Sequence, residues 1–285
     1  MFEGAKPVAF HTAGNSLGEG AFWDASGQRL LWVDILEQRA MVKQGNSFSN
    51  YKLPVMPSVI WKVTEEQVYL ASEKGVGILA LSDGDYRTVV EVEADRPDTR
   101  SNDGGVAPDG SFWFGTVLNE PKGKGGAIYR VAPDLSVERM AAPVGIPNTF
   151  LFPSSGEYAL IGDSLERRIY RYSIDGDHLG AREVWMEKGS NDGGTPDGSV
   201  LIGERMVINA EWDGGRIVAY DMEGRECDAL SLPVSRPTSC ALGGADGRTL
   251  FITSAREGLT REEIAQQPDA GAVFAVQLQG LTNVW

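Results

Sequence analysis

The stretch LLWVDI at residues 30–35 is repeated in altered form five more times along the chain. Each copy is a short apolar run that ends near an acidic or small residue. In most copies a polar turn follows, and after it a second apolar run. Such paired runs predict neighbouring β-strands. The six copies are LLWVDI (30–35), VYLASE (68–73), FWFGTV (112–117), YALIGDS (158–164), VINAEW (207–212) and LFITSAR (250–256).

The spacing of the copies predicts the architecture. One residue near the end of each copy is taken as equivalent and called an anchor, and successive anchors lie 39, 43, 47, 48 and 44 residues apart. A repeat of about 40–50 residues that is built from strands is typical of a β-propeller. We therefore predict an all-β fold of six four-stranded blades in one domain, residues 1–285. The anchors are Asp34, Glu73, Thr116, Asp163, Glu211 and Ala255.

The closing of the ring requires a partner for the edge of the last blade. The strand-like segment KPVAF (6–10) precedes the first copy, so we expect it to join the sixth blade as its outer strand. We expect the acidic anchors to bond neighbouring turns and the tryptophans to fill the spaces between blades. These tryptophans are Trp23, Trp32, Trp61, Trp113, Trp185 and Trp212.

Composition excludes several classes of partner. The net charge of −14 disfavours nucleic acid and anionic membranes. No apolar run approaches the length of a membrane span, and the N-terminus does not resemble a secretory signal. The two cysteines, Cys227 and Cys240, are expected to be free thiols. These features together predict a cytoplasmic protein, of which the sequence does not fix the oligomeric state.

A second register lies 14 or 15 residues before the anchors, where the innermost strand of each blade is expected to begin. Equivalent positions of successive blades face one another around the channel of a propeller, so these residues are expected to converge at one of its mouths. Four of the six positions carry a carboxylate or amide side chain, with oxygens that can bind a cation. The positions are Glu19, Ser58, Asn102, Asn148, Asp197 and Cys240–Ala241.

Three of these residues form a candidate metal site. Glu19, Asn148 and Asp197 offer two carboxylates and an amide oxygen, a donor set that suits a hard cation such as Ca²⁺, Mg²⁺ or Mn²⁺. Three protein ligands leave positions for water and substrate. Arg100 lies two residues before Asn102, so both are expected to face the channel, where the guanidinium can clamp a hydroxyl-rich or anionic substrate. The alternative is that the oxygen-bearing residues cap turns at strand ends.

Several longer motifs resemble the senescence marker protein/regucalcin/gluconolactonase family. The resemblance runs from about residue 15 to 276. It implies a six-bladed propeller with a divalent metal in its channel, and hydrolysis of sugar lactones. The motifs that carry it are LGEGAFWD (17–24), RSNDGG (100–105) with PDGSFWFGT (108–116), GIPNTF (145–150), TPDGS (195–199) and PVSRPTSCALGG (233–244).

The resemblance also implies roles for residues. Glu19, Asn148 and Asp197 match the metal ligands of the family, with Asp197 also the general base, and Arg100 and Asn102 match its substrate contacts. Glu120, or Asn119 beside it, matches a further contact in a loop. The ion, calcium first, with Mg²⁺, Mn²⁺, Fe²⁺ and Zn²⁺ as alternatives, would polarise the lactone carbonyl and activate water.

The chain also departs from the family pattern. Thr149 replaces the usual glycine after IPN, Ser199 replaces the usual methionine after PDG, and Gly105 stands where lysine is common. These changes bear on substrate identity more than on the metal.

Two other functions stay open at this stage. One is a different metal-dependent esterase or organophosphate hydrolase on the same scaffold, although a chain with only two histidines offers little support for histidine chemistry. The other is a non-catalytic propeller that binds calcium or a protein partner. Neither the lactone nor the native metal can be read from the sequence.

Overall fold

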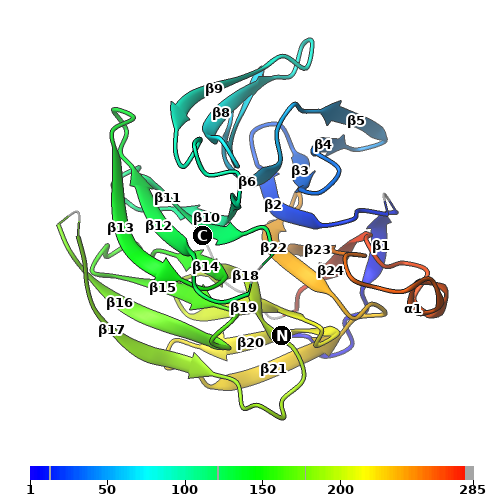
Figure 1. Cartoon of the computed structure of the whole chain (residues 1–285). Helices are drawn as coiled ribbons and strands as arrows, with labels where there is room; N and C mark the ends of the chain where they lie inside the picture. The colour runs from blue at the N-terminus through cyan, green and yellow to red at the C-terminus, as the bar shows by residue number, and fades with distance from the viewer. Residues whose placement is uncertain (13, 121, 177, 280–285) are drawn as a thin grey trace. The chain divides into compact units, whose positions relative to one another are not determined.

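The computed structural model describes residues 1–12, 14–120, 122–176 and 178–279. In this part of the chain the strands form six four-stranded antiparallel sheets, and consecutive strands are hydrogen-bonded neighbours within five of them (Figure 1). These sheets are the blades of a six-bladed β-propeller, which confirms the fold expected from the repeat. The end of the chain, LTNVW (281–285), lies outside the described residues.

The chain divides into two compact units, which are described separately. One unit comprises Pro54–Pro196 and holds the second, third and fourth sheets. Their strands are β6 (Pro57–Val63), β7 (Gln67–Ser72), β8 (Gly75–Ala80) and β9 (Tyr86–Glu91); β10 (Thr99–Val106), β11 (Phe112–Leu118), β12 (Gly126–Val131) and β13 (Val137–Val144); and β14 (Pro147–Leu151), β15 (Tyr158–Asp163), β16 (Arg168–Asp175) and β17 (His178–Glu187).

The other unit comprises Met1–Leu53 and Asp197–Trp285 and holds the first, fifth and sixth sheets. Because it contains the N-terminus it is called the first unit, and Pro54–Pro196 is called the second unit. The prediction of a single domain is a separate question and stays a prediction. The strands are β2 (Gly18–Asp24), β3 (Arg29–Asp34), β4 (Arg39–Gln44) and β5 (Ser47–Lys52); β18 (Thr195–Ile202), β19 (Met206–Trp212), β20 (Arg216–Asp221) and β21 (Glu226–Ser231); and β22 (Pro237–Gly243), β23 (Thr249–Ser254), β24 (Val273–Gln277) and β1 (Val8–His11).

The N-terminal strand completes the sixth sheet, as predicted. β1 pairs antiparallel with β24, and Val8 lies opposite Ala275 (Figure 1). The first strand of the chain thereby covers an edge that would otherwise expose unpaired backbone groups.

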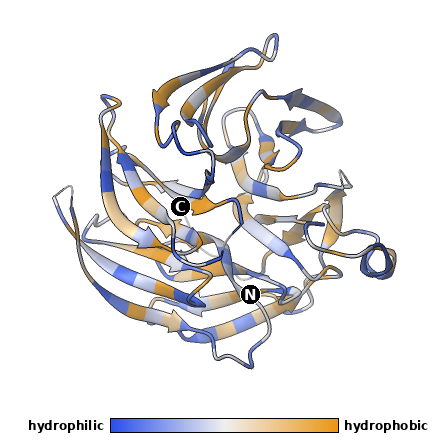
Figure 2. Cartoon of the chain, viewed as in Figure 1, coloured by the Kyte–Doolittle hydropathy of each residue, from blue (hydrophilic) through white to orange (hydrophobic). Residues whose placement is uncertain are grey.

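Burial explains the apolar runs of the repeat. The second strand of each sheet is buried along most of its length, as in β11, where six of the seven residues are buried. Strands covered on both faces are apolar throughout rather than alternating. The outermost strands β5, β17 and β21 are mostly exposed and carry many polar residues (Figure 2).

Aromatic side chains pack between neighbouring sheets within each unit. Trp61 of the second sheet stacks on Phe112 of the third at 5.1 Å between ring centroids. In the other unit, Trp23 of the first sheet stacks on Phe251 of the sixth at 5.3 Å. Trp32 and Trp113 are almost completely buried. For these tryptophans the expected role between blades is confirmed.

One short helix, α1 (Arg261–Gln266), occurs in the described residues. It begins at a capping box in which Thr260 and Glu263 satisfy each other's backbone amides, and none of its residues is buried. Within the described part of the chain, no helix has the length and apolar character needed to cross a lipid bilayer. The two cysteines are unbonded, as predicted.

Candidate functional site

A one-residue β-bulge recurs near the start of the innermost strand in five of the sheets. Between Glu19 and Phe22, β2 advances by three residues while its partner β3 advances by two. Between Asn148 and Phe150, β14 advances by two residues while its partner β15 advances by one. The same excess of one residue occurs in β6, β10 and β22. Bulges re-aim side chains and are frequent beside active sites. Glu19, Asn102 and Asn148 therefore occupy equivalent, bulged positions of their sheets.

The second unit brings three predicted site residues into direct contact. Arg100 Nη1 donates to Asn102 Oδ1 at 2.7 Å, and Asn102 Nδ2 donates to Asn148 Oδ1 at 2.9 Å. Asn102 Nδ2 also donates to the Pro147 carbonyl at 3.0 Å. The expectation that Arg100 and Asn102 face the same side is confirmed. The guanidinium lies one amide group away from the proposed ligand Asn148.

Asp103 fastens β10 to β14 at this point. Its carboxylate accepts from the Gly104 amide and from the Thr149 amide, both at 2.8 Å. Thr149 is fully buried and has a φ of 53°, a left-handed conformation that is rare for a β-branched residue. The family's usual glycine at this position has a conformational reason, and the Asp103 carboxylate holds the strained threonine in place here.

Burial raises the pKa of the Asp103 carboxyl to about 6, against the lowering effect of its two amide donors. Because the folded protein binds this proton more tightly than the unfolded chain does, this contribution to stability is present at low pH and is lost as pH rises through about 6. Asparagine cannot titrate. The free energy of unfolding of Asp103→Asn, relative to wild type, is therefore expected to improve by about 1 kcal/mol between pH 5 and 7.5.

Urea unfolding of metal-free protein at the two pH values measures this difference. Parallel pH profiles for the two proteins would show that the Asp103 carboxyl does not titrate in this range.

Ser164 continues the contacts on the other side of Asn148. Asn148 Nδ2 donates to Ser164 Oγ at 2.8 Å, and Ser164 Oγ donates to the Pro196 carbonyl at 2.5 Å. Asn148 and Ser164 are both buried. The peptide of Pro196 leads directly into Asp197. Sequence reasoning did not select Ser164, although it directly follows the anchor Asp163, where the first and third sheets have Ile35 and Val117.

The first unit holds the two carboxylates of the candidate site. Glu19 and Asp197 are 8% and 4% exposed. Burial raises the pKa of the Cys240 thiol, and the Asp197 and Glu19 carboxylates raise it further. Both carboxylates therefore raise the pKa of the same buried thiol. In the sequence, Cys240 occupies the same register as Glu19 and Asp197. Asn209, fully buried, donates to the Asp197 carbonyl at 2.8 Å and holds the backbone there.

The donor chemistry of these residues fits a hard divalent cation. Two buried carboxylates that act on one thiol are stabilised by a cation, and an amide oxygen with two lone pairs keeps one after accepting from Asn102. Within the described ranges, no three or more His, Cys, Asp or Glu side chains cluster in a way that could hold a metal. The expected set has only two such residues and an asparagine.

Glu120 lies in an exposed loop, where its carboxylate pairs with Lys122 at 2.7 Å and is 80% exposed. Asn119, the alternative contact, donates from Nδ2 to the Pro97 carbonyl at 2.9 Å. That bond ties the end of β11 to the segment before β10. The role of either residue toward a substrate stays a prediction.

The acidic anchors Asp34 and Asp163 hold turns, as expected. Asp34 accepts from the amides of Ser16 and Leu17, and Asp163 accepts from those of Gly145 and Ile146. The Glu211 carboxylate accepts hydrogen bonds from the Arg216 guanidinium and from the Tyr220 hydroxyl. A carboxylate that satisfies buried backbone amides stabilises the fold and does not need a ligand.

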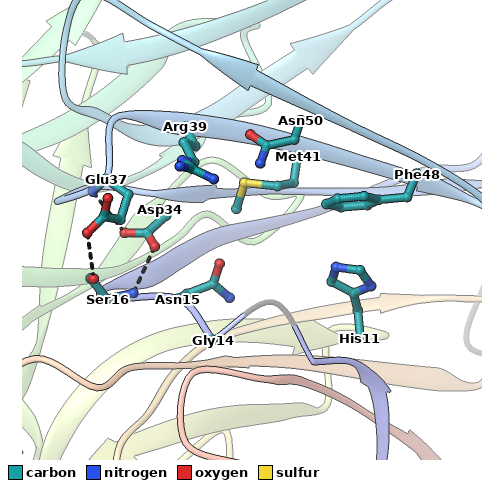
Figure 3. Close-up of a pocket in the computed structure, with 10 residues that line it drawn as sticks. All are labelled: His11, Gly14, Asn15, Ser16, Asp34, Glu37, Arg39, Met41, Phe48 and Asn50. Atoms are coloured by element: carbon teal, nitrogen blue, oxygen red, sulfur yellow. Dashed lines mark hydrogen bonds between the residues drawn. The ribbon is translucent and has the colours of Figure 1, made fainter.

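A separate cavity of about 290 Å³ lies within the first unit, between the N-terminal segment and the first sheet (Figure 3). His11 and Phe48 contact each other at its wall, with ring centroids 4.2 Å apart and ring planes tilted by 31°. Ser16 Oγ donates to Glu37 at 2.9 Å, and Asp34 accepts from the Ser16 amide (Figure 3). Burial and the nearby Lys43 lower the pKa of His11. The acidic groups of this cavity hold the entry to β2.

Comparison with known proteins points to one family. The model of the SMP-30/gluconolactonase/LRE-like region matches residues 17–256. A 6-deoxy-6-sulfogluconolactonase of Pseudomonas putida is 33% identical over 274 residues, which cover 92% of this chain and 91% of that protein. An L-arabinolactonase of Azospirillum brasilense is 34% identical over 271 residues, 92% of this chain and 89% of that protein.

A solved structure agrees with both the fold and the sequence matches. Regucalcin from Agrobacterium tumefaciens, described as a calcium-binding protein, superposes with a TM-score of 0.91 at 29% identity and covers 97% of this chain and 95% of that one. The matched region contains Glu19, Arg100, Asn102, Asn148 and Asp197. With its six four-stranded sheets and a match over most of its length, the chain belongs to the SMP-30/gluconolactonase/LRE-like family.

Proposed function

We propose that this chain hydrolyses a sugar lactone to the free sugar acid, with one divalent metal ion held by Glu19, Asn148 and Asp197. The observation that carries the proposal is the shared register of these oxygen donors at the start of innermost strands, with bulges at Glu19 and Asn148. All three side chains are buried. The proposal is supported by family membership and by relatives named as lactonases.

A divalent ion in such a site supplies Lewis acidity toward the carbonyl oxygen of an ester. The residues of this chain divide the remaining work. Asp197 accepts the proton of the attacking water at its carboxylate, as a general base. Arg100, held by Asn102, donates hydrogen bonds to hydroxyls or to an acidic group of the sugar. Glu120 and Asn102 complete the contacts to the sugar.

A panel of substrates tests this function. Hexono- and pentonolactones, an aryl ester and a phosphotriester are offered to metal-loaded protein, and acid release is followed with a pH indicator. We expect turnover of one or two aldonolactones at least about tenfold above the other ester classes. Faster turnover of the aryl ester or phosphotriester would assign the site to a different hydrolase.

A second candidate is a non-catalytic calcium-binding protein, which the likeness to the regucalcin structure favours. Measurements of Ca²⁺ binding and lactone turnover on one preparation of protein distinguish the two functions. Stoichiometric Ca²⁺ binding without turnover of any lactone, in folded protein, would support the binding role against the lactonase.

A further inference from the structure

A chain of hydrogen bonds runs in one direction through the proposed ligand Asn148. Arg100 donates to Asn102, Asn102 to Asn148, Asn148 to Ser164, and Ser164 to the Pro196 carbonyl. The five residues come from β10, β14, the turn after β15, and β18. All of them lie in the unit Pro54–Pro196.

The last bond of this chain decides the orientation of the Asn148 amide. Ser164 carries one hydroxyl proton, and that proton is given to the Pro196 carbonyl at 2.5 Å. Toward Asn148 the Ser164 oxygen can then only accept, so Asn148 must present Nδ2 to it. The Asn148 oxygen is thereby directed to the opposite side, where Asn102 Nδ2 donates to it.

A reversed amide would fail at both ends. Asn148 Nδ2 would face Asn102 Nδ2, two donors without an acceptor, and Asn148 Oδ1 would face a hydroxyl oxygen that has no proton to give. An unmade bond of a buried polar group costs about 1–3 kcal/mol. The bond to Pro196 adds a second effect, because it fixes the peptide that leads into Asp197.

We propose that Ser164 is a positioning residue of the metal site. It orients the Asn148 amide so that Oδ1 points away from Ser164, where it would be available to the ion, and it holds the backbone before Asp197. This inference rests on the proposed function, since it presumes that Asn148 is a ligand. Partners of metal ligands typically change metal affinity by about 10–100-fold when they are removed.

The experiment measures Mn²⁺ binding to chelated, dialysed protein by titration calorimetry. Ser164→Ala is expected to weaken Mn²⁺ binding by about 10–100-fold. Ser111→Ala is the matched control: Ser111 Oγ is also buried, donates one bond, to Asp109, and accepts one, from Trp113 Nε1. It lies at the other end of the β10–β11 hairpin from Arg100, so its removal is expected to leave Mn²⁺ affinity unchanged within about twofold.

A second background separates orientation from general damage. In Asn148→Asp the ligand has two equivalent oxygens and needs no orientation. Adding Ser164→Ala to Asn148→Asp is therefore expected to weaken Mn²⁺ binding at least about threefold less than it does in the wild-type background, because only the effect on the backbone before Asp197 remains. Equal losses in both backgrounds, or a Ser164→Ala protein that binds Mn²⁺ like wild type, would overturn the proposal. Thermal melting shows that each variant is folded at the temperature of the titration.

The same data distinguish failure of this inference from failure of the proposed function. If wild type binds no Mn²⁺, or if Asp197→Ala binds it equally well, the proposed metal site itself is wrong. If wild type binds one Mn²⁺ that Asp197→Ala loses, the site stands and only the role of Ser164 is in question.

Discussion

Replacing Asp197 with alanine is expected to lower kcat/KM for the lactone by at least about 10³-fold and to weaken metal binding in the same variant. A general base contributes about 10²–10⁴-fold to a rate, and Asp197 is also proposed as a ligand. Its carboxylate is buried, and together with the Glu19 carboxylate it raises the pKa of the Cys240 thiol. Loss of the base and of the ligand therefore coincide in one side chain.

Asp197→Asn distinguishes the two roles, since it keeps an oxygen ligand but cannot accept the proton. We expect it to retain part of the Mn²⁺ affinity while hydrolysis stays near the level of Asp197→Ala. Asp192→Ala is the control, because Asp192 lies in the exposed loop just before β18 and its carboxylate accepts from the Gly189 amide of the same loop. Full activity of Asp197→Ala after chelation would refute the mechanism.

Replacing Gly105 with alanine is expected to lower stability by about 3 kcal/mol and Tm by about 5–10 °C. A Cβ at Gly105 would overlap the carbonyl oxygen of Phe150, because β10 approaches β14 closely there. Backbone cannot move aside as a flexible side chain can. A lysine, which is common at this position in the family pattern, would place its Cβ against the same carbonyl.

Gly193→Ala is the matched control, since a Cβ at Gly193 meets no atom within 4 Å. Differential scanning calorimetry of metal-free protein compares the three chains. A Gly105→Ala protein that melts within 1–2 °C of both others would show that β10 and β14 are not packed as closely as the structure indicates.

The two departures from the family pattern at Gly105 and Thr149 lie at the same place in the structure. Both lie where β10 meets β14: Gly105 against the Phe150 carbonyl, Thr149 against the Asp103 carboxylate. The sequence showed each change separately, as a loss of a common residue. Only the structure shows that both residues lie where β10 packs against β14, beside Asn148.

The fold could be predicted from the sequence because the same physical requirement recurs in every blade. Each second strand is mostly buried and is therefore apolar, and the acidic anchors Asp34 and Asp163 satisfy turn amides. Repetition turned weak local patterns into a strong one. The closing strand could be predicted because an uncovered sheet edge is unfavourable.

The local geometry of the site could not be predicted in the same way. A bulge is one extra residue in a ladder, and nothing in the residue types of Asn102–Asp103 marks it. Ser164 and Asn209 donate to the carbonyls of Pro196 and Asp197, and such individual contacts between separate segments leave no periodic pattern in the sequence. Arg100 and Asn102 were accessible to sequence reasoning because residues two apart in a strand share a face.

The most direct test of the account is lactone hydrolysis by chelated protein before and after addition of Ca²⁺, Mg²⁺, Mn²⁺, Fe²⁺ or Zn²⁺. Acid release from the lactone preferred in the substrate panel is followed with a pH indicator, above the spontaneous rate. We expect the chelated protein to retain less than about one hundredth of the activity and at least one ion to restore it. Full activity of chelated protein without added metal, or no turnover with any ion in folded protein, would contradict the account.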